Sequence, residues 1–217
     1  MAWCDEKGRD DSMAETLGRV VDRFLLLDPA WRPASEDAAP PARAVVGYWP
    51  VQDDGGIGKF CANPAYRPGD RNSPSDPLDA ALRLLLRGQA SSAQIQLMMR
   101  DTLVDIAVQV GGRPLVVSSP DGRESVVVAT GEPHRARIGA PGWRRAATLE
   151  DLVELLDGDV DVLFNRGGPA SVRLTGDFVR ETMLIGTEEA AELYAAQRNP
   201  GGLRVIPWGP RNAAQPW

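Results

Sequence analysis

Short runs of β-branched and aliphatic residues follow one another through the second half of the chain, with glycine-containing turns between them. Gly111-Gly112 and Asp121-Gly122 separate three such runs, at residues 103–110, 114–118 and 125–130. This spacing is typical of strands joined by tight turns, and it predicts an antiparallel meander. A fourth run, residues 160–164, is almost wholly apolar and is therefore expected inside a sheet.

Amphipathic helical segments flank these strands. Asp76-Pro77 supplies an N-cap and a first-turn proline, and leucines recur at helical spacing until Gly88. Thr148 begins a similar segment that Gly158 ends. Further helices are predicted over residues 92–100, 176–184 and 187–197. The pattern predicts an α+β (mixed α/β) fold with a central, mostly antiparallel or mixed sheet and flanking amphipathic helices.

The first part of the chain predicts an N-terminal helix and a β-hairpin ahead of this sheet. Apolar residues at helical spacing indicate a helix over residues 12–27. Two β-like runs, 44–51 and 57–62, are joined by Asp53-Asp54-Gly55-Gly56, as in a hairpin. Three segments follow: residues 1–101 with the helix, hairpin and next helices, 102–184 with the main α/β domain, and 185–217 with a helix, a short strand at 203–206 and an extended tail.

Composition and charge narrow the range of partners and compartments. The net charge of −6, without a basic stripe, disfavours nucleic acid as a partner. No apolar stretch reaches the roughly 18–20 residues of a membrane span, and the acidic N-terminal residues do not resemble a signal peptide. We therefore expect a cytoplasmic protein without membrane insertion. Cys4 and Cys61 are expected to be reduced, with Cys61 in the core and no bridge between them.

The sequence offers little for catalysis, metal binding or cofactor binding. Its single histidine, His134, lies in a turn-like stretch and is interpreted as an exposed loop residue, and no Gly-x-Ser-x-Gly motif accompanies it. Asp157, Asp159 and Asp161 alternate as in a calcium loop but lack its glycine and final glutamate. No phosphate-binding glycine motif is present. We expect no enzyme activity, no metal and no cofactor.

Residues in or beside loops are the candidates for binding a protein partner. Large rings in loops can anchor a partner, and a glycine turn can present backbone amides to a ligand. Core packing of the rings and plain turn geometry remain the alternative explanations. The candidate partner-binding residues are Trp49, Tyr66, Arg67, Asn165, Gly167 and Gly168.

Several short motifs occur in the order found in one known family. They are Asp28-Pro29-Ala30-Trp31, Val45-Val46-Gly47-Tyr48-Trp49, Asn63-Pro64-Ala65-Tyr66-Arg67-Pro68, Asp76-Pro77-Leu78-Asp79-Ala80 and Asn165-Arg166-Gly167-Gly168-Pro169. On these motifs the chain resembles the type VII secretion system-associated proteins of actinobacteria, whose second half is similar to the N-terminal domain of the enhanced serine sensitivity protein SseB. Residues 126–130 depart from the Pro-Val-Phe-Thr-Ser-like stretch usual in that family.

The resemblance implies an α/β domain without an assigned catalytic residue and an accessory role beside a type VII secretion locus. We therefore expect a non-catalytic cytosolic accessory factor that binds a protein from that locus. An immunity protein that neutralises a secreted toxin is the alternative, because an acidic, cytosolic domain would suit that role. An uncharacterised hydrolase is a third reading and would need a pocket of convergent polar groups.

Overall fold

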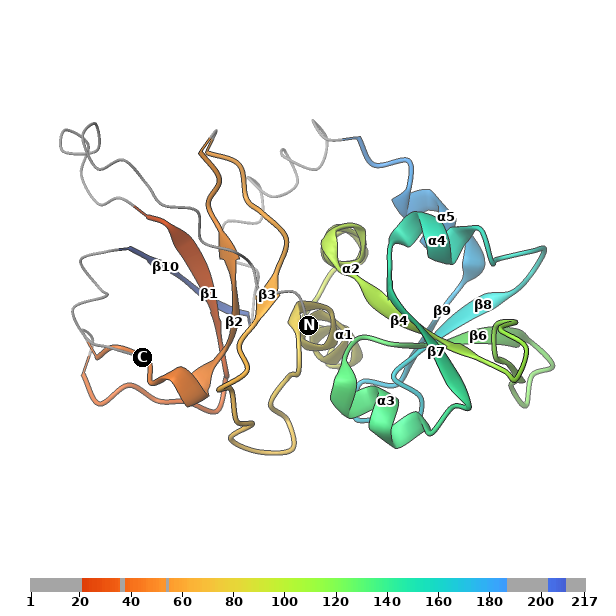
Figure 1. Cartoon of the computed structure of the whole chain (residues 1–217), viewed down its shortest axis with the longest axis horizontal. Coiled ribbons are helices and arrows are strands. Elements are labelled where there is room, and N and C mark those ends of the chain that lie inside the picture. Colours follow the sequence, from red (N-terminus) through yellow and green to blue (C-terminus); the bar gives the residue numbers. More distant parts are fainter. Residues whose placement is uncertain (1–20, 36–37, 54, 187–202, 210–217) are drawn as a thin grey trace. The chain divides into compact units, whose positions relative to one another are not determined.

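The computed structural model describes residues 21–35, 38–53, 55–186 and 203–209 (Figure 1). These residues belong to two compact units. The first unit comprises residues 1–69 and 204–217, and the second comprises residues 70–203. The units divide the chain elsewhere than the predicted boundaries at 101 and 184, because the helices after residue 76 share a core with the second sheet. In the described residues, no helix is long and apolar enough to span a membrane.

The first unit holds an antiparallel sheet with the strand order β10-β1-β2-β3. These strands are β1 (Arg23–Leu27), β2 (Val45–Pro50), β3 (Cys61–Ala62) and β10 (Arg204–Trp208), and a 3-10 turn, η1 (Ala42–Ala44), precedes β2. The helix predicted over residues 12–27 is wrong at its end, because residues 23–27 form a strand paired on both sides. Pairing with two neighbours decided the conformation of an apolar run that suits either structure. Residues 12–20 lie outside the described residues.

The predicted hairpin of the first unit is confirmed. β2 and β3 pair antiparallel, and Val51 forms an antiparallel bridge with Ile57 nearer the turn. Gly47 permits this pairing, since a Cβ atom there would lie 2.4 Å from the carbonyl oxygen of Cys61. The expectation of a reduced core thiol at Cys61 is wrong: this residue is only half-buried and is disulfide-bonded. Cys4 lies outside the described residues.

The second unit holds a mixed sheet with the strand order β7-β4-β6-β8-β9, and β5 also pairs with β6. Its central pair, β6 and β8, is parallel, whereas the other pairs are antiparallel. The predicted mixed sheet and apolar interior strand are therefore confirmed. The bounds are β4 (Val104–Val108), β5 (Val116–Ser118), β6 (Glu124–Ala129), β7 (Gly142–Ala147), β8 (Asp161–Phe164) and β9 (Val172–Leu174).

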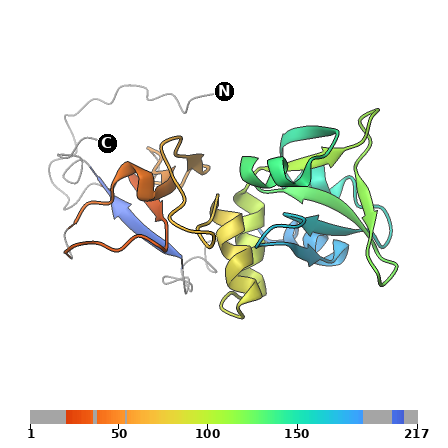
Figure 2. The same cartoon turned by 90° about the horizontal axis from the view of Figure 1, so that it is seen from below.

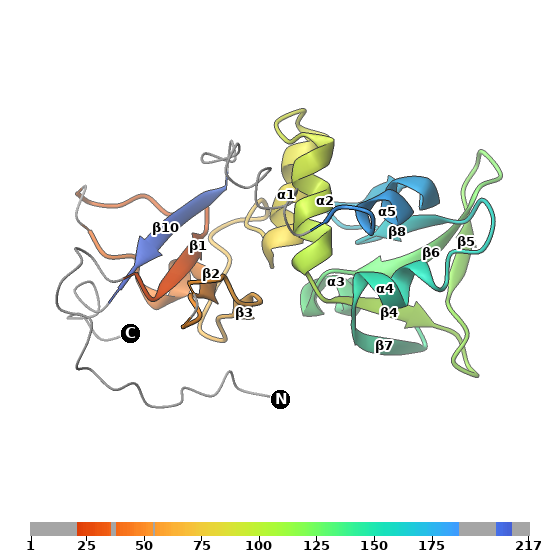
Figure 3. The ribbon, with the colours of Figure 1, turned by 90° about the horizontal axis from the view of Figure 1, so that it is seen from above.

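Five helices flank this sheet in the described residues: α1 (Pro77–Leu86), α2 (Ser92–Asp101), α3 (Glu132–Ile138), α4 (Leu149–Val153) and α5 (Gly176–Thr182). α1 and α2 lie side by side (Figure 2), and α2 also contacts α5 (Figure 3). Side-chain caps at Asp76, Ser91, Thr148 and Thr175 begin the four predicted helices that are described. Neither α3 nor β7 was predicted from the sequence. The helix predicted over 187–197 lies outside the described residues.

The core of the second unit forms where α1, α2, α4 and α5 press apolar side chains against the sheet. Leu78, Leu82, Ile95, Ile106 and Phe164 are all fully buried there. Burial of each such side chain stabilises the fold by about 1.5–3 kcal/mol. This core sets the N-terminal end of α1 beside the ends of β6 and β8, where the polar groups described next are buried.

Candidate functional site

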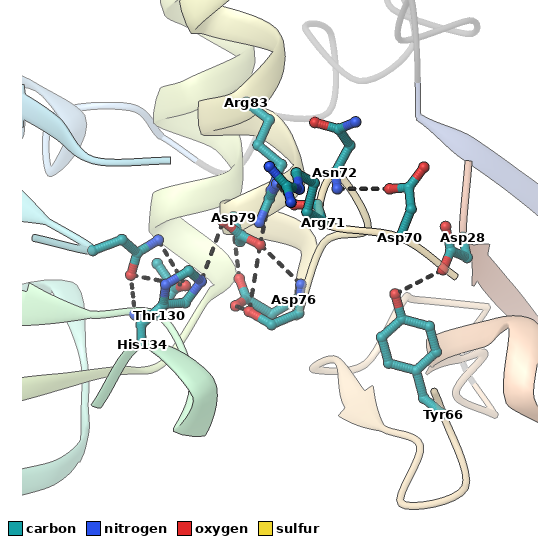
Figure 4. Close-up of polar contacts among 12 residues, drawn as sticks. Asp28, Tyr66, Asp70, Arg71, Asn72, Asp76, Asp79, Arg83, Thr130 and His134 are labelled. Atoms are coloured by element: carbon teal, nitrogen blue, oxygen red, sulfur yellow. Dashed lines mark hydrogen bonds and ion pairs between the residues drawn. The ribbon is translucent and has the colours of Figure 1, made fainter. Parts of the chain in front are cut away.

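A cluster of buried polar side chains lies in the second unit at the start of α1. Asp76 is the N-cap of that helix, and its Oδ1 accepts a hydrogen bond from the Asp79 backbone nitrogen at 2.8 Å. Its Oδ2 accepts from the Ser75 hydroxyl at 2.7 Å. Asp79 is fully buried and Asp76 nearly so. The helix cap therefore places two carboxyl groups close together away from water (Figure 4).

His134 faces this pair from α3. Its Nε2 lies 3.2 Å from Asp79 Oδ1, and the residue is only 3% exposed. The interpretation of His134 as an exposed loop residue is wrong, for a physical reason. Gly131 and Pro133, which read as a turn, are the N-cap and an early helical residue of α3, and this short helix turns the imidazole inward.

The second oxygen of Asp79 is also occupied. Oδ2 accepts hydrogen bonds from the Ser75 backbone nitrogen at 2.9 Å and from Arg83 Nε at 3.1 Å. Arg83 is itself buried, and its Nη1 donates to the carbonyl of Arg71 at 3.2 Å. Asp79 thus lies between the His134 imidazole and the Arg83 guanidinium, which supply the polar partners that a buried carboxylate requires.

The ends of the two parallel strands complete the cluster. Thr130 directly follows β6, and Asn165 directly follows β8. Asn165 is fully buried, and its Oδ1 accepts from the Thr130 backbone nitrogen at 3.0 Å. Its Nδ2 donates to the Thr130 hydroxyl at 3.1 Å. These bonds tie the two strand ends together next to His134 and Asp76.

Gly168 brings the Asn165-Pro169 turn up to the histidine. A Cβ atom on Gly168 would lie 3.3 Å from His134 Nδ1 and 3.1 Å from Arg137 Nη1. It would also lie 3.0 Å from the carbonyl oxygen of Asn165. The glycine therefore allows a close approach at which a larger residue would force its neighbours to shift by a few tenths of an ångström.

The surroundings shift the pKa values of the two carboxyl groups in opposite directions. Burial, followed by the nearby charge of Asp79, raises the pKa of Asp76 above its ordinary value. Burial is also the largest influence on Asp79 and opposes its ionisation, but His134 and then Arg83 outweigh it and lower the pKa of Asp79. Asp79 is therefore the ionised member of the pair and Asp76 the one that holds a proton more readily.

Paired carboxyl groups with pKa values moved apart, beside a histidine, are found in acid–base catalysis. Here, however, the side chains of Asp76, Asp79 and His134 are each at least nine-tenths buried. Their polar atoms are directed mainly at one another and at neighbouring protein groups. In the part of the chain that the structure describes, no group of three or more His, Cys, Asp or Glu side chains is placed to hold a metal ion.

The candidate partner-binding residues fall into two separate groups. Asn165 and Gly168 belong to the buried cluster, and Gly167 is exposed in the same turn with φ +71°. Trp49, Tyr66 and Arg67 belong to the first unit. The sequence analysis gave no role to Asp76 and Asp79 beyond the start of a helix, although a second aspartate three residues after an N-cap aspartate was the available signal.

In the first unit, each of the three candidates has a local partner. Trp49 packs edge-on against Phe60 with ring centroids 4.9 Å apart. The Tyr66 hydroxyl donates to Asp28 Oδ2 at 3.0 Å. Arg67 is exposed, and its Nη1 donates to the carbonyl of Tyr66 at 2.7 Å. Tyr66 and Arg67 therefore fix a surface loop, while the Arg67 guanidinium stays open to solvent.

Comparison with protein-family models, with curated proteins and with solved structures found no match for this chain.

Proposed function

We propose that this chain is a non-catalytic accessory factor that acts in the cytoplasm by binding a protein encoded at a type VII secretion locus. The observation that supports this most is the engagement of the Asp79 carboxylate by His134, Arg83 and Ser75. A general base must reach a substrate proton within hydrogen-bond distance. The only histidine instead directs Nε2 at the buried Asp79 carboxylate, and His134 itself is only 3% exposed.

The surface of the first unit supports the binding part of the proposal. Arg67 is exposed next to Tyr66, and the half-buried ring of Trp49 lies on β2. Arginine and large aromatic residues are the types that contribute most at protein interfaces. The net charge of −6 favours a protein partner over nucleic acid.

The test is capture of the tagged chain from the actinobacterial host that the sequence resemblance implies, with partners identified by mass spectrometry. We expect enrichment of a product of the same locus. Arg67→Glu should reduce that enrichment, because it reverses a charge on the proposed surface. Arg123→Glu is the matched control, since Arg123 is an exposed residue of the second unit.

Three outcomes distinguish the alternatives. Capture of a toxin, together with rescue of growth on co-expression, would favour an immunity protein. Hydrolysis of an ester, amide or phosphate substrate that requires His134 would overturn the non-catalytic proposal. Repeated capture without any product of the locus would count against the secretion role.

A further inference from the structure

The carboxyl ends of β6 and β8 form one edge of the second sheet. The two strands are parallel, so Thr130 and Asn165, which follow them, lie at the same edge and hydrogen-bond to each other. In sheets with parallel strands, ligands bind outside this edge, where loops and helix starts converge.

His134 Nδ1 is a buried polar atom next to the turn at this edge. Both ring nitrogens and Asp79 Oδ1 are buried without a hydrogen bond among the described residues, but Nε2 lies 3.2 Å from Asp79 Oδ1, whereas no ion pair of Nδ1 occurs in that part of the chain. The direction of Nδ1 is known from Gly168, since a Cβ atom there would lie 3.3 Å from it. Buried polar atoms in native proteins nearly always have a partner, so an orphan in a polar setting indicates that something else supplies one.

Arg137 Nη1 points to the same place. It would lie 3.1 Å from that Gly168 Cβ atom, and Arg137 is exposed. No hydrogen bond or ion pair of the Arg137 side chain occurs within the described ranges. His134 and Arg137 are three residues apart on α3 and so occupy one face of that helix. Within the described residues, two nitrogen groups without partners thus lie beside Gly168, whose Cβ position is also 3.0 Å from the carbonyl oxygen of Asn165.

The Asn165-Pro169 turn contributes backbone amides as further hydrogen-bond donors. Within the described part of the chain, the backbone amides of Arg166 and Gly167 donate to no group. The φ angles of Asn165 and Gly167 are +51° and +71°, whereas that of Arg166 between them is not positive. Changes in the sign of φ between successive residues also occur in the turns that form backbone anion sites.

We propose that His134, Arg137 and the Asn165-Pro169 turn bind a small oxyanion, a phosphate or carboxylate group, beside Gly168. Nδ1 is the ring nitrogen that faces away from Asp79, and an imidazole N–H at that position would donate to an oxyanion. Arg137 supplies a permanent positive charge and donors suited to oxyanions. Asp79 is a positioning residue, because its contact with Nε2 orients the His134 ring so that Nδ1 lies beside Gly168.

This proposal is separate from the proposed function, because it concerns residues of the second unit and does not require a protein partner. The chain could bind its secretion-locus partner and fail to bind an oxyanion, or the reverse. The experiment below therefore uses the full chain alone, without any partner.

Nuclear magnetic resonance of the ¹⁵N-labelled full chain tests the proposal directly. His134 is the only histidine, so its ring nitrogen signals need no assignment. Phosphate and acetate are titrated separately, with chloride at matched ionic strength as the reference. We expect a saturable shift of the His134 ring signals and of the Gly167 and Gly168 amides with at least one of the two anions. The anion that binds more tightly identifies the source as a phosphate or a carboxylate group.

Matched variants decide whether the site is the one proposed. Arg137→Gln should weaken binding about tenfold, the usual effect of losing one charged hydrogen bond. Arg123→Gln, the same change at an exposed arginine just before β6, should leave binding unchanged. Gly168→Ala should abolish binding, because the added methyl occupies the space that both nitrogens face.

Clear results would overturn the proposal. One is the absence of any saturable shift of the His134 ring with either anion. Another is binding to Arg137→Gln that equals the wild type. Gly168→Ala brings its methyl within 3.0 Å of the Asn165 carbonyl oxygen, so its folding is checked by circular dichroism. If it does not fold, the Arg137→Gln comparison alone decides.

Discussion

Asp79 is the residue on which the buried cluster depends. Its carboxylate has a histidine on one oxygen and an arginine with a backbone amide on the other. A buried ion pair contributes little net free energy compared with apolar packing, but removal of one member leaves the other charged and without a partner. Removal of the charge of either Asp79 or Arg83 should therefore destabilise the fold.

We expect Asp79→Asn to lower the free energy of unfolding by about 3 kcal/mol or more, because Arg83 then stays buried without a counter-charge. Urea denaturation followed by circular dichroism measures this. Asp177→Asn is the control, since the Asp177 carboxylate pairs with Arg180 but is 83% exposed. That variant should unfold close to the wild type. Equal effects of the two substitutions would contradict the role given to Asp79.

Asp76 leads to a prediction about pH. Its folded pKa is raised above the ordinary value of 3.8 by burial and by the charge of Asp79. The folded state therefore holds a proton that the unfolded state has lost, and stability falls as pH rises from the unfolded pKa through the folded one. The lowered pKa of Asp79 acts in the opposite sense, with stability lost as pH falls through its folded pKa.

Asp76→Asn isolates the first of these effects. Asparagine caps a helix as well as aspartate does but does not titrate. The stability of the Asp76→Asn variant relative to the wild type should be lowest below about pH 4. It should then increase with pH until Asp76 is ionised in the folded wild type. Urea denaturation across a pH series checks this. A difference that stays constant with pH would show that the Asp76 carboxyl does not titrate as proposed.

The residues of this cluster illustrate what a sequence can and cannot predict. The N-cap at Asp76 is local and was predicted, because an aspartate before a proline and a leucine-rich segment has few other uses. The burial of His134 was not, because Gly131 and Pro133 suit a turn and a helix start equally. Only the packing of α3 next to α1 decides between them, and the single sequence carries no signal of that packing.

At the scale of elements, the pairing of β4 with β7 contains an irregularity. The register shifts between Val104 and Ile106, and Ala146 opposite has φ +54°, a conformation that residues with a Cβ atom rarely adopt. Its amide donates to Asp105 Oδ1 at 3.0 Å. The bulge thus binds β7 to the Asp105 carboxylate, which also pairs with Arg135.

We expect Ala146→Gly to stabilise the chain by up to about 1 kcal/mol, because glycine removes the steric cost of the left-handed conformation. The extra freedom of glycine in the unfolded state offsets part of this gain. Ala147→Gly is the matched control and should destabilise, since Ala147 is buried in an extended strand. Urea midpoints of the three proteins compare them. Equal destabilisation by both substitutions would mean that Ala146 carries no strain.

Elements with a local signature were predicted well, and those that depend on distant partners were not. Glycine turns located the hairpin, and the N-caps at Asp76 and Thr148 located α1 and α4. β1 was predicted as a helix because Phe24 and Leu25 fit a helical spacing, and its true partners are far away in sequence. β7, with Arg144 and Arg145 in a short mixed run, has too little alternation to be read as a strand.

At the scale of the whole molecule, the first unit depends on a strand from near the end of the chain. β10 pairs with β1 in full register from Arg23 with Trp208 to Leu27 with Arg204. The Trp208 side chain is buried against Leu25, Leu27 and Val45. The core of the second unit is built entirely from residues between 78 and 179. The two cores therefore draw on different parts of the chain.

We expect deletion of residues 204–217 to unfold the first sheet and to spare the second. Without β10, β1 loses one row of backbone hydrogen bonds and the apolar contacts of Trp208, and a small sheet has little stability in reserve. Hydrogen exchange should speed up in β1 and β2, while the amides of β6 and β8 keep their protection. Asp79→Asn in the full chain is the complementary control and should expose β6 and β8 first. Simultaneous loss of protection in both sheets after the deletion would show that the two units unfold as one.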